Sequence, residues 1–380
     1  MIRRRWSSLL ASGVLVLLLP AAETPAGELL VGTYTQGASE GIYRFRFDSA
    51  TGHLDPRPLQ VLKTANPSWL VLSADQRRVY AVNENGPGQV DPVGRVSSFA
   101  IDPQSRWLSP LNQVPSQGDE PTHASLSRDE RYLFVANYAV QPQPGGNLAV
   151  LKLADDGRLA AVMQRERQAA QHQASSHPHS VVSSADGRYV FVSDLGADRV
   201  FVYRYRAEHP IPLEAAAAVV LPTGSGPRHL WFGVGGRHVY LTLELSAQVA
   251  VFDYREGRLE RRQLLDLAAG RPASDKAAGA LHGSADGRFL YVSNRGTANQ
   301  LLVFAIDPDS GQLDEIQRRS VEGIEPREFS LDPTGRFVLV ANQRSNQVVV
   351  LARDPATGLL GEVIQRLAID SPAALQFLSH

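Results

Sequence analysis

One motif recurs along this chain about every 50 residues, and it limits the fold more than any other feature. Its clearest copy, residues 178–204, reads as three short strands separated by two turns. The first turn contains Asp186-Gly187, and Asp-Gly between apolar runs is a hairpin signal because both residues tolerate tight turns. The second strand contains the uninterrupted apolar run 189–192, so both faces of this small sheet need neighbours that cover them.

Six copies of the motif align through the turn that precedes the second strand. Each turn ends in an arginine, and these are Arg77, Arg131, Arg188, Arg237, Arg288 and Arg336. Ten residues before each arginine stands a leading residue that opens the first strand, and these are Pro67, Pro121, Pro178, Pro227, Ala278 and Pro326. Repeated β-strand units at this period are typical of a β-propeller.

The two ends of the repeat region complete each other. Residues 29–54 look like a copy that lacks its first strand, whereas residues 372–377 look like a first strand without the rest of its copy. We therefore predict an all-β fold, a seven-bladed β-propeller whose ring is closed by the C-terminal strand joining the N-terminal blade. The outermost strands are expected in less regular segments such as 59–64 and 264–267.

Residues 1–26 are predicted to be a signal peptide, and residues 27–380 a single propeller domain. Three arginines at 3–5 form a basic start, residues 9–19 form an apolar stretch too short for an ordinary membrane span, and small residues follow. Cleavage is expected between residues 21 and 26, and the alternative is an uncleaved N-terminal anchor. The expected location is periplasmic or secreted, and the chain has no cysteine for a disulfide or a lipid anchor.

Charged and aromatic residues recur where the strands of these copies begin and end. First strands line the axis of a propeller, and the loops after the second strands lie beside their starts, so these residues should converge. The candidates that follow the leading residues are His123, His179, Arg228, His229, Arg327 and Glu328. The candidates after the second strands are Glu84, Tyr138, Asp194, Glu244 and Arg295. Two interpretations remain open, a set of salt bridges between blades and an anion-binding catalytic pocket.

Several of these segments resemble the seven-bladed β-propeller lactonase family, which includes the propeller-type 6-phosphogluconolactonases and is similar to carboxymuconate-cyclising propellers. The most specific motifs are Pro-Arg-His at 227–229, Pro-His at 178–179 and Asn-Arg-Gly at 294–296. The resemblance covers residues 29–378. It implies a lactonase that acts on a sugar-derived or related small lactone and needs no cofactor, and the predicted signal peptide makes this an exported enzyme.

Lactone hydrolysis assigns roles to these residue types. A neutral histidine, His179 or His229, is expected to take a proton from the attacking water. Arg228 and Arg295 are expected to hold the oxyanion or an anionic group of the substrate, and Glu244 to orient the histidine. The expected substrate-binding residues are His123, Glu84, Tyr138, Asp194, His282, Arg327 and Glu328. His282 has the alternative of packing within its own strand.

The partners implied are few. Zinc held by His123, His177 and His179 is an alternative, but no metal site is predicted, because histidines distributed around a ring are more often not ligands. The formal net charge of −1 argues against a nucleic acid, and no membrane contact is expected beyond export. The alternative function, from another class, is a non-enzymatic secreted propeller that binds a small anionic ligand or a protein partner.

Overall fold

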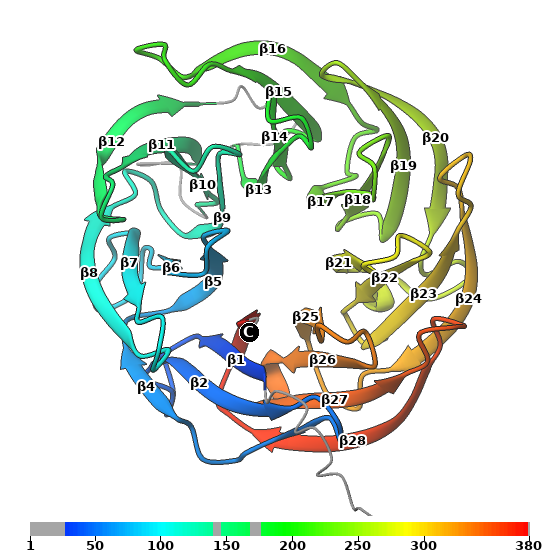
Figure 1. Cartoon of the computed structure of the whole chain (residues 1–380). Coiled ribbons are helices and arrows are strands. Elements are labelled where there is room, and N and C mark those ends of the chain that lie inside the picture. The colour runs from blue at the N-terminus through cyan, green and yellow to red at the C-terminus, as the bar shows by residue number, and fades with distance from the viewer. Residues whose placement is uncertain (1–26, 140–145, 168–175, 379–380) are drawn as a thin grey trace, which may run out of the picture.

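The computed structural model describes residues 27–139, 146–167 and 176–378 (Figure 1). The predicted signal peptide lies outside these residues. The described chain forms seven antiparallel sheets arranged as blades around one axis, which confirms the all-β, seven-bladed β-propeller. No helix among the described residues is long and apolar enough to cross a membrane.

Each blade runs from a first strand near the axis to a fourth strand at the rim (Figure 1). From blade one to blade seven, the first strands are β29 (Pro372–Leu378), β5 (Pro67–Leu72), β9 (Pro121–Leu126), β13 (Pro178–Ser183), β17 (Pro227–Phe232), β21 (Ala278–Gly283) and β25 (Pro326–Leu331). The second strands are β1 (Gly27–Thr33), β6 (Arg78–Asn83), β10 (Tyr132–Asn137), β14 (Tyr189–Asp194), β18 (His238–Leu243), β22 (Phe289–Asn294) and β26 (Phe337–Asn342).

The outer half of each blade follows the same order. The third strands are β2 (Gly41–Asp48), β7 (Arg95–Ile101), β11 (Asn147–Leu153), β15 (Arg199–Tyr205), β19 (Gln248–Arg255), β23 (Gln300–Ile306) and β27 (Gln347–Arg353). The fourth strands are β3 (His53–Leu54) with β4 (Gln60–Lys63), β8 (Leu108–Pro115), β12 (Leu159–Glu166), β16 (Leu213–Val220), β20 (Arg258–Asp266), β24 (Leu313–Ser320) and β28 (Leu360–Ala368). Two short 3₁₀ helices, η1 (Ala273–Asp275) and η2 (Gln343–Ser345), lie between strands.

The Asp-Gly turn of blade four shows why the motif repeats. Asp186 Oδ1 accepts hydrogen bonds from Ser184 Oγ at 2.5 Å and from the Arg188 amide at 3.1 Å. Ser184 Oγ in turn accepts one from the Tyr189 amide at 3.0 Å, so the short polar side chains satisfy the backbone of the turn. Gly187 has a φ of +69°, a conformation that glycine adopts without strain.

The second strands are buried on both faces, as their apolar runs predict. In β14, Phe191 packs into a cluster with Val239 and Leu241 of blade five. Its neighbours Val190 and Val192 point to the opposite face and pack with Phe134 and Val150 of blade three. Successive side chains of one strand therefore tie a blade to both of its neighbours.

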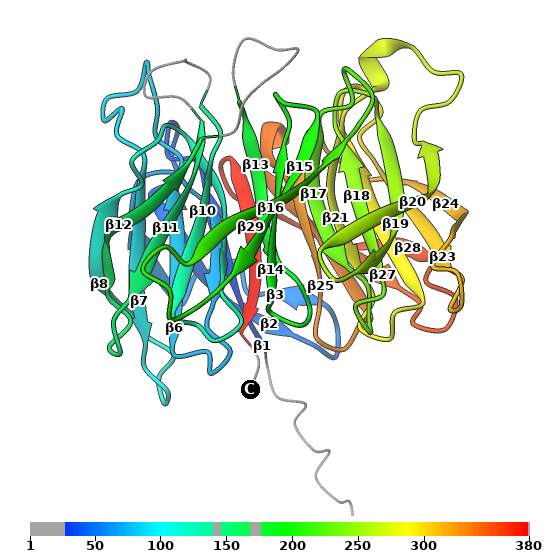
Figure 2. The same ribbon diagram turned by 90° about the horizontal axis from the view of Figure 1, so that it is seen from above.

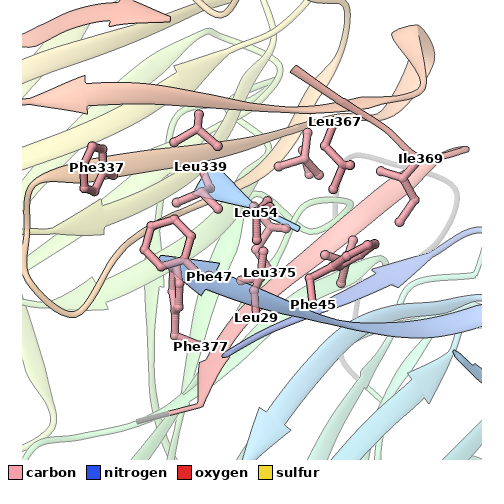
Figure 3. Close-up of a cluster of buried hydrophobic side chains, with 14 residues drawn as sticks. Leu29, Phe45, Phe47, Leu54, Phe337, Leu339, Leu367, Ile369, Leu375 and Phe377 are labelled. Atoms are coloured by element: carbon pink, nitrogen blue, oxygen red, sulfur yellow. The ribbon is translucent and has the colours of Figure 1, made fainter. Parts of the chain in front are cut away.

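The ring closes where the two ends of the chain meet. β29 pairs antiparallel with β1, with Leu29 opposite Phe377 and Val31 opposite Leu375, which confirms the predicted closure. Figure 3 shows the apolar cluster that covers this junction, with side chains from both chain ends and from blade seven. Phe47 lies at its centre, its ring centroid 5.2 Å from that of Phe377 and 6.0 Å from that of Phe337.

The outer strands differ from expectation in two places. In blade one the outer strand is split into β3 and β4, both paired with β2. Pro56 and Pro58 lie in the break, and neither has an amide to donate to a ladder. In blade five the strand expected at 264–267 begins earlier, at Arg258, because Gly257 with a φ of +80° allows an immediate hairpin.

The first strands all begin at the same end of the ring, which is the upper side in Figure 2. We call this end the leading face. Residues 86–94, which follow the second strand of blade two, lie on it, and Gln89 Oε1 there accepts a hydrogen bond from Asn66 Nδ2 at 2.9 Å.

Candidate active site

Three histidines and one tryptophan from four blades meet around the ring axis, and we call them the histidine group. Trp69 belongs to β5, His123 to β9, His179 to β13 and His229 to β17. The ring centroids of Trp69 and His123 are 4.2 Å apart, and the two rings stack. His229 lies 5.5 Å from His123 and 5.3 Å from His179, again between ring centroids. Blades three and five are not neighbours, so these side chains reach across the axis.

The histidine group is held neutral. Burial and, after it, the positive charge of Arg228 lower the pKa of His123 to about 3. Burial and the same arginine hold the pKa of His179 and of His229 well below the usual 6.5. At neutral pH these imidazoles are therefore unprotonated.

Arginines and glutamates from blades five to seven form a second cluster, the arginine group. Its members are Arg228, Glu244, Arg295 and Glu325. Glu244 Oε2 lies 2.9 Å from Arg228 Nε and 2.8 Å from Arg295 Nη2. Arg295 Nη1 reaches Glu325 Oε1 at 2.9 Å. Burial alone would raise the pKa of Glu244, but Arg295 and Arg228 outweigh it and hold that pKa below its usual value.

Arg228 is the most deeply buried charge of the group, with 1% of its side chain exposed. Its contact with Glu244 is short but is not aligned as a hydrogen bond, and its Nη1 has no partner among the described residues. Burial and then Arg295 lower the pKa of Arg228 to about 10, which still leaves it charged at neutral pH. A buried cationic N–H without an acceptor is costly, so Arg228 Nη1 is suited to donate a hydrogen bond to an anionic or carbonyl oxygen.

A third arginine lies nearby with its own carboxylate. Arg327 Nη2 is 3.2 Å from Glu84 Oε2, which also accepts hydrogen bonds from Tyr34 Oη at 2.8 Å and Ser68 Oγ at 2.5 Å. The Arg327 guanidinium lies 5.4 Å from the centroid of the Tyr34 ring. The predicted residues Glu84 and Arg327 are therefore brought together, although 243 positions separate them in the chain.

Tyr138 connects the two groups. Its ring lies edge-on to His179, with centroids 5.5 Å apart. Burial and, after it, the negative charge of Glu244 raise its pKa to about 12. The tyrosine hydroxyl is therefore protonated at neutral pH and able to donate a hydrogen bond.

Two of the predicted residues lie together a little further along the axis. His282 Nε2 is 2.5 Å from Glu328 Oε1, and the same oxygen accepts a hydrogen bond from the Phe329 amide at 2.9 Å. The predicted alternative for His282, packing within its own strand, is not what the structure shows. Its contact with Glu328 joins blade six to blade seven.

Asp194 does not join these groups. Its carboxylate accepts hydrogen bonds from Ser176 Oγ and from the amides of His177 and Ala197. Asp194 is the last residue of its second strand, the position held elsewhere by Asn83, Asn137, Asn294 and Asn342. The residues that face the axis come one position later, so the expectation for Asp194 was displaced by one residue.

The orienting role expected of Glu244 is also not realised. Its carboxylate lies between two guanidinium groups rather than against His179 or His229. The physical reason is charge: neutral imidazoles do not compete with two arginines for a buried carboxylate. Glu244 therefore fixes the positions of Arg228 and Arg295.

Sequence reasoning missed Glu325 and gave no role to Trp69. Glu325 directly precedes the leading residue Pro326 and has a φ of +61°, an uncommon conformation for a residue with a side chain. Glu120, before Pro121, has a φ of +51°. A glutamate before a leading proline was therefore the available signal for a second acidic position on the leading face.

The described part of the chain contains no cluster of three or more His, Cys, Asp or Glu residues arranged to hold a metal ion. A groove of about 990 Å³ lies where the first strands of blades two to five end, opposite the leading face. Its walls include Val71, Leu126, Val182, Trp231 and Phe232. It lacks the histidines and paired arginines of the leading face, so we place the candidate chemistry at the leading face.

A seven-bladed propeller with neutral histidines beside buried arginines on its axis has the parts of a hydrolytic enzyme. Comparison with known proteins gives the family. The family described as "Lactonase, 7-bladed beta-propeller" matches residues 28–377. The chain belongs to this family, whose enzyme class is that of the lactone hydrolases.

Individual relatives agree with this assignment. The chain is 31% identical over 354 residues to a 6-phosphogluconolactonase of Bacillus subtilis, covering 92% of this chain and 97% of that protein. It is 30% identical to a 6-phosphogluconolactonase of Formosa agariphila, covering 93% and 99%. Among solved structures, the periplasmic gluconolactonase PpgL of Pseudomonas aeruginosa is similar with a TM-score of 0.90 and 55% identity, covering 93% of this chain and 99% of that one.

Proposed function

We propose that this protein is an exported lactonase that hydrolyses an unphosphorylated sugar lactone on the leading face. The observation that carries the proposal is Arg228, a buried cation whose Nη1 lacks a partner and which lies beside neutral histidines. Such a donor fits the oxygen that becomes negative when water attacks an ester carbonyl.

The reaction needs a water molecule, a donor for the oxyanion and a proton acceptor. Water attacks the carbonyl carbon of the lactone, and the carbonyl oxygen becomes an oxyanion held by Arg228. An unprotonated imidazole, that of His179 or His229, takes the proton of the water. When the intermediate collapses, the bond to the ring oxygen breaks and that oxygen receives the proton, which yields the open hydroxy acid.

The remaining residues are proposed to hold the sugar. Tyr138 has a protonated hydroxyl, and His123 offers a neutral imidazole, so both suit the hydroxyl groups of a lactone. Arg295 keeps Glu244 in place. Glu84 and Arg327 lie together, so the carboxylate can accept a hydrogen bond from a substrate hydroxyl and the guanidinium can donate one to it. Asp194 is left out because its oxygens are used within its own loop.

The charge balance of the leading face favours an unphosphorylated substrate. Arg228, Arg295 and Arg327 each contact a carboxylate, and Glu84, Glu244 and Glu325 supply three negative charges against three positive ones. A phosphate group is best held by arginines that have no carboxylate partner. The similar PpgL is described as a gluconolactonase, which agrees with this preference.

Export is proposed from the N-terminal sequence, which has the basic start and apolar stretch of a signal peptide. PpgL is described as periplasmic, and this supports the same compartment here. N-terminal sequencing of protein recovered outside the cytoplasm checks it, with cleavage expected between residues 21 and 26.

The function is tested by turnover. Purified mature protein beginning near Gly27 is mixed with D-glucono-1,5-lactone or its 6-phosphate, and acid release is followed with the uncatalysed rate subtracted. We expect turnover, with a higher kcat/KM for the unphosphorylated lactone. A higher kcat/KM for the phosphate ester would overturn the substrate assignment. No turnover of several five- and six-membered lactones would favour the non-enzymatic binding propeller.

A further inference from the structure

Glu325 adds a second carboxylate to an arginine that already has one. Its Oε1 lies 2.9 Å from Arg295 Nη1, and Glu244 Oε2 lies 2.8 Å from Nη2 of the same arginine. Removing Glu325 would therefore leave Arg295 paired, whereas removing Glu244 would take a carboxylate from Arg228 as well. Glu325 is thus the carboxylate of the arginine group whose loss leaves no buried arginine unpaired.

The main chain holds Glu325 on the leading face without help from its carboxylate. The Glu325 amide donates a hydrogen bond to Asn299 Oδ1 at 2.8 Å, and the Glu325 carbonyl oxygen accepts one from the Gln343 amide at 2.9 Å. The side chain lies beside Arg295, with 15% of it exposed to solvent. A change of this side chain should therefore alter the charge of the site and leave the loop in place.

The charge of Glu325 also acts on a second arginine, Arg327. Burial alone would lower the pKa of Arg327, but the acidic groups around it, Glu325 among them, raise it above its ordinary value. After burial, both Arg295 and Arg327 contribute to the lowered pKa values of Arg228 and His179. The two arginines that Glu325 neutralises therefore lie close to the oxyanion donor and to a proton acceptor of the proposed reaction.

The affinity of such a site for an anion depends on how far its arginines are neutralised. A guanidinium binds a phosphate or carboxylate group with two parallel hydrogen bonds when its donors are free. Both terminal nitrogens of Arg295 already contact carboxylates. A phosphate group of a substrate would have to displace Glu325 and would be repelled by its charge, whereas an uncharged hydroxyl would not.

We propose that Glu325 sets the specificity of the leading face for lactones without an anionic substituent. Its carboxylate supplies the counter-charge that Arg295 and Arg327 would otherwise offer to a phosphate or carboxylate group of the substrate. Without that negative charge, the same arginines bind the phosphate of a phosphorylated sugar lactone. This inference rests on the proposed function and names the residue that selects the substrate class at that same site.

The test measures kcat/KM of the parent, Glu325→Gln and Glu325→Gly on D-glucono-1,5-lactone and on its 6-phosphate. Glutamine removes the charge and keeps the size, whereas glycine also makes room and adopts the φ of +61° without strain. We expect the ratio of kcat/KM for the 6-phosphate to that for the unphosphorylated lactone to rise by about 10–100-fold in both variants. This is the usual effect of gaining one hydrogen bond between charged groups.

The control is Glu322→Gln, which makes the same change three residues earlier in the same loop. Glu322 also has a positive φ, +55°, and lies between two arginines, 2.6 Å from Arg319 Nη1 and 3.1 Å from Arg366 Nη2. Those arginines belong to the fourth strands β24 and β28 at the rim, so the ratio should stay at the parent value. Circular dichroism verifies that each variant is folded, and either Glu325 variant alone is sufficient for the comparison.

The outcomes separate this inference from the proposed function. Parent turnover with an unchanged ratio in the folded Glu325 variants, or an equal rise in Glu322→Gln, overturns this inference alone. A parent that prefers the 6-phosphate overturns the substrate assignment and this inference together. If the parent turns over no lactone, the proposed function fails, and calorimetric titration with inorganic phosphate decides the inference. Tighter binding to Glu325→Gln than to the parent and Glu322→Gln supports it, and equal binding overturns it.

Discussion

The histidine group and the arginine group are buried to a similar degree but meet the cost of burial in opposite ways. The histidines remain neutral, with their pKa values lowered by burial and by Arg228. The arginines stay charged and are balanced by carboxylates, with Glu244 shared between Arg228 and Arg295. One half of the site thus supplies uncharged hydrogen-bonding rings, and the other half supplies a fixed field for an oxyanion.

This difference predicts different failures. Removing a charge from the arginine group leaves its partner buried and unpaired, whereas removing one neutral imidazole leaves no charge behind. Three experiments follow from the comparison.

The largest effect is expected for Glu244→Gln. The substitution keeps the shape of the side chain but leaves Arg228 without a carboxylate and Arg295 with Glu325 alone. Breaking a buried ion pair in this way costs about 3–5 kcal/mol. Equilibrium urea unfolding measures the loss. The control is Glu208→Gln, whose exposed contact with Arg131 should leave the free energy of unfolding unchanged. Equal stability of parent and Glu244→Gln would contradict the role given to this cluster.

The next effect is on catalysis. Arg228→Ala removes the donor proposed for the oxyanion, so kcat/KM on a lactone should fall by about 10²–10³-fold. His229→Ala removes one of the two imidazoles proposed to take the proton of the water. It should lower kcat if His229 is that acceptor, whereas a rise in KM alone would leave the role to His179. If Arg228 serves only a salt bridge between blades, the melting temperature of Arg228→Ala will drop while its activity per folded molecule persists. Full activity in both variants would argue against the enzymatic assignment.

The fold was predictable because its signals are local and repeated. The Asp-Gly turn, the leading prolines and the apolar second strands each follow from short-range chemistry, and the incomplete copies at 29–54 and 372–377 required closure. Because the same pattern occurs in seven blades, an assignment that is uncertain in one copy can be checked against the others. Errors in one copy, such as the late start assigned to the outer strand of blade five, therefore did not change the architecture.

The site was predictable as a set of residues but not as a set of contacts. Irregular pairing at the start of several first strands, for example between Pro178 and Ser180, changes which side chain faces the axis, and no sequence signal fixes it. The error at Asp194 has another cause. Asp194 pairs with Pro178 as Asn83 pairs with Pro67, so equal spacing from the leading residue would have selected Leu195 as the counterpart of Glu84. The partners of Glu244 could not be predicted from the sequence either. Two arginines from different blades share its carboxylate only because the packing of those blades brings both side chains to it.

The smallest expected effect separates the two groups by pH. A histidine whose pKa is lowered on folding binds its proton more readily in the unfolded chain, so its contribution to stability is complete above about pH 6.5 and is lost as the pH falls below that value. The pKa of His123 is about 3 in the folded protein, and those of His179 and His229 are well below 6.5, so all three act in this window.

The arginine group should not act between pH 6.5 and 5. The pKa of Glu244 is held below its usual 4.5 by Arg295 and Arg228 against the effect of burial, so its contribution is present above about pH 4.5 and is lost only at lower pH. Unfolding free energies measured by urea from pH 7 to pH 5 should therefore fall with a slope set by the histidines, about 1.4 kcal/mol per pH unit for each. His229→Gln should reduce that slope by one histidine, while His209→Gln, at an exposed position, should not change it. A slope unaffected by His229→Gln would mean that this ring is protonated in the folded protein and would remove the contrast between the two groups.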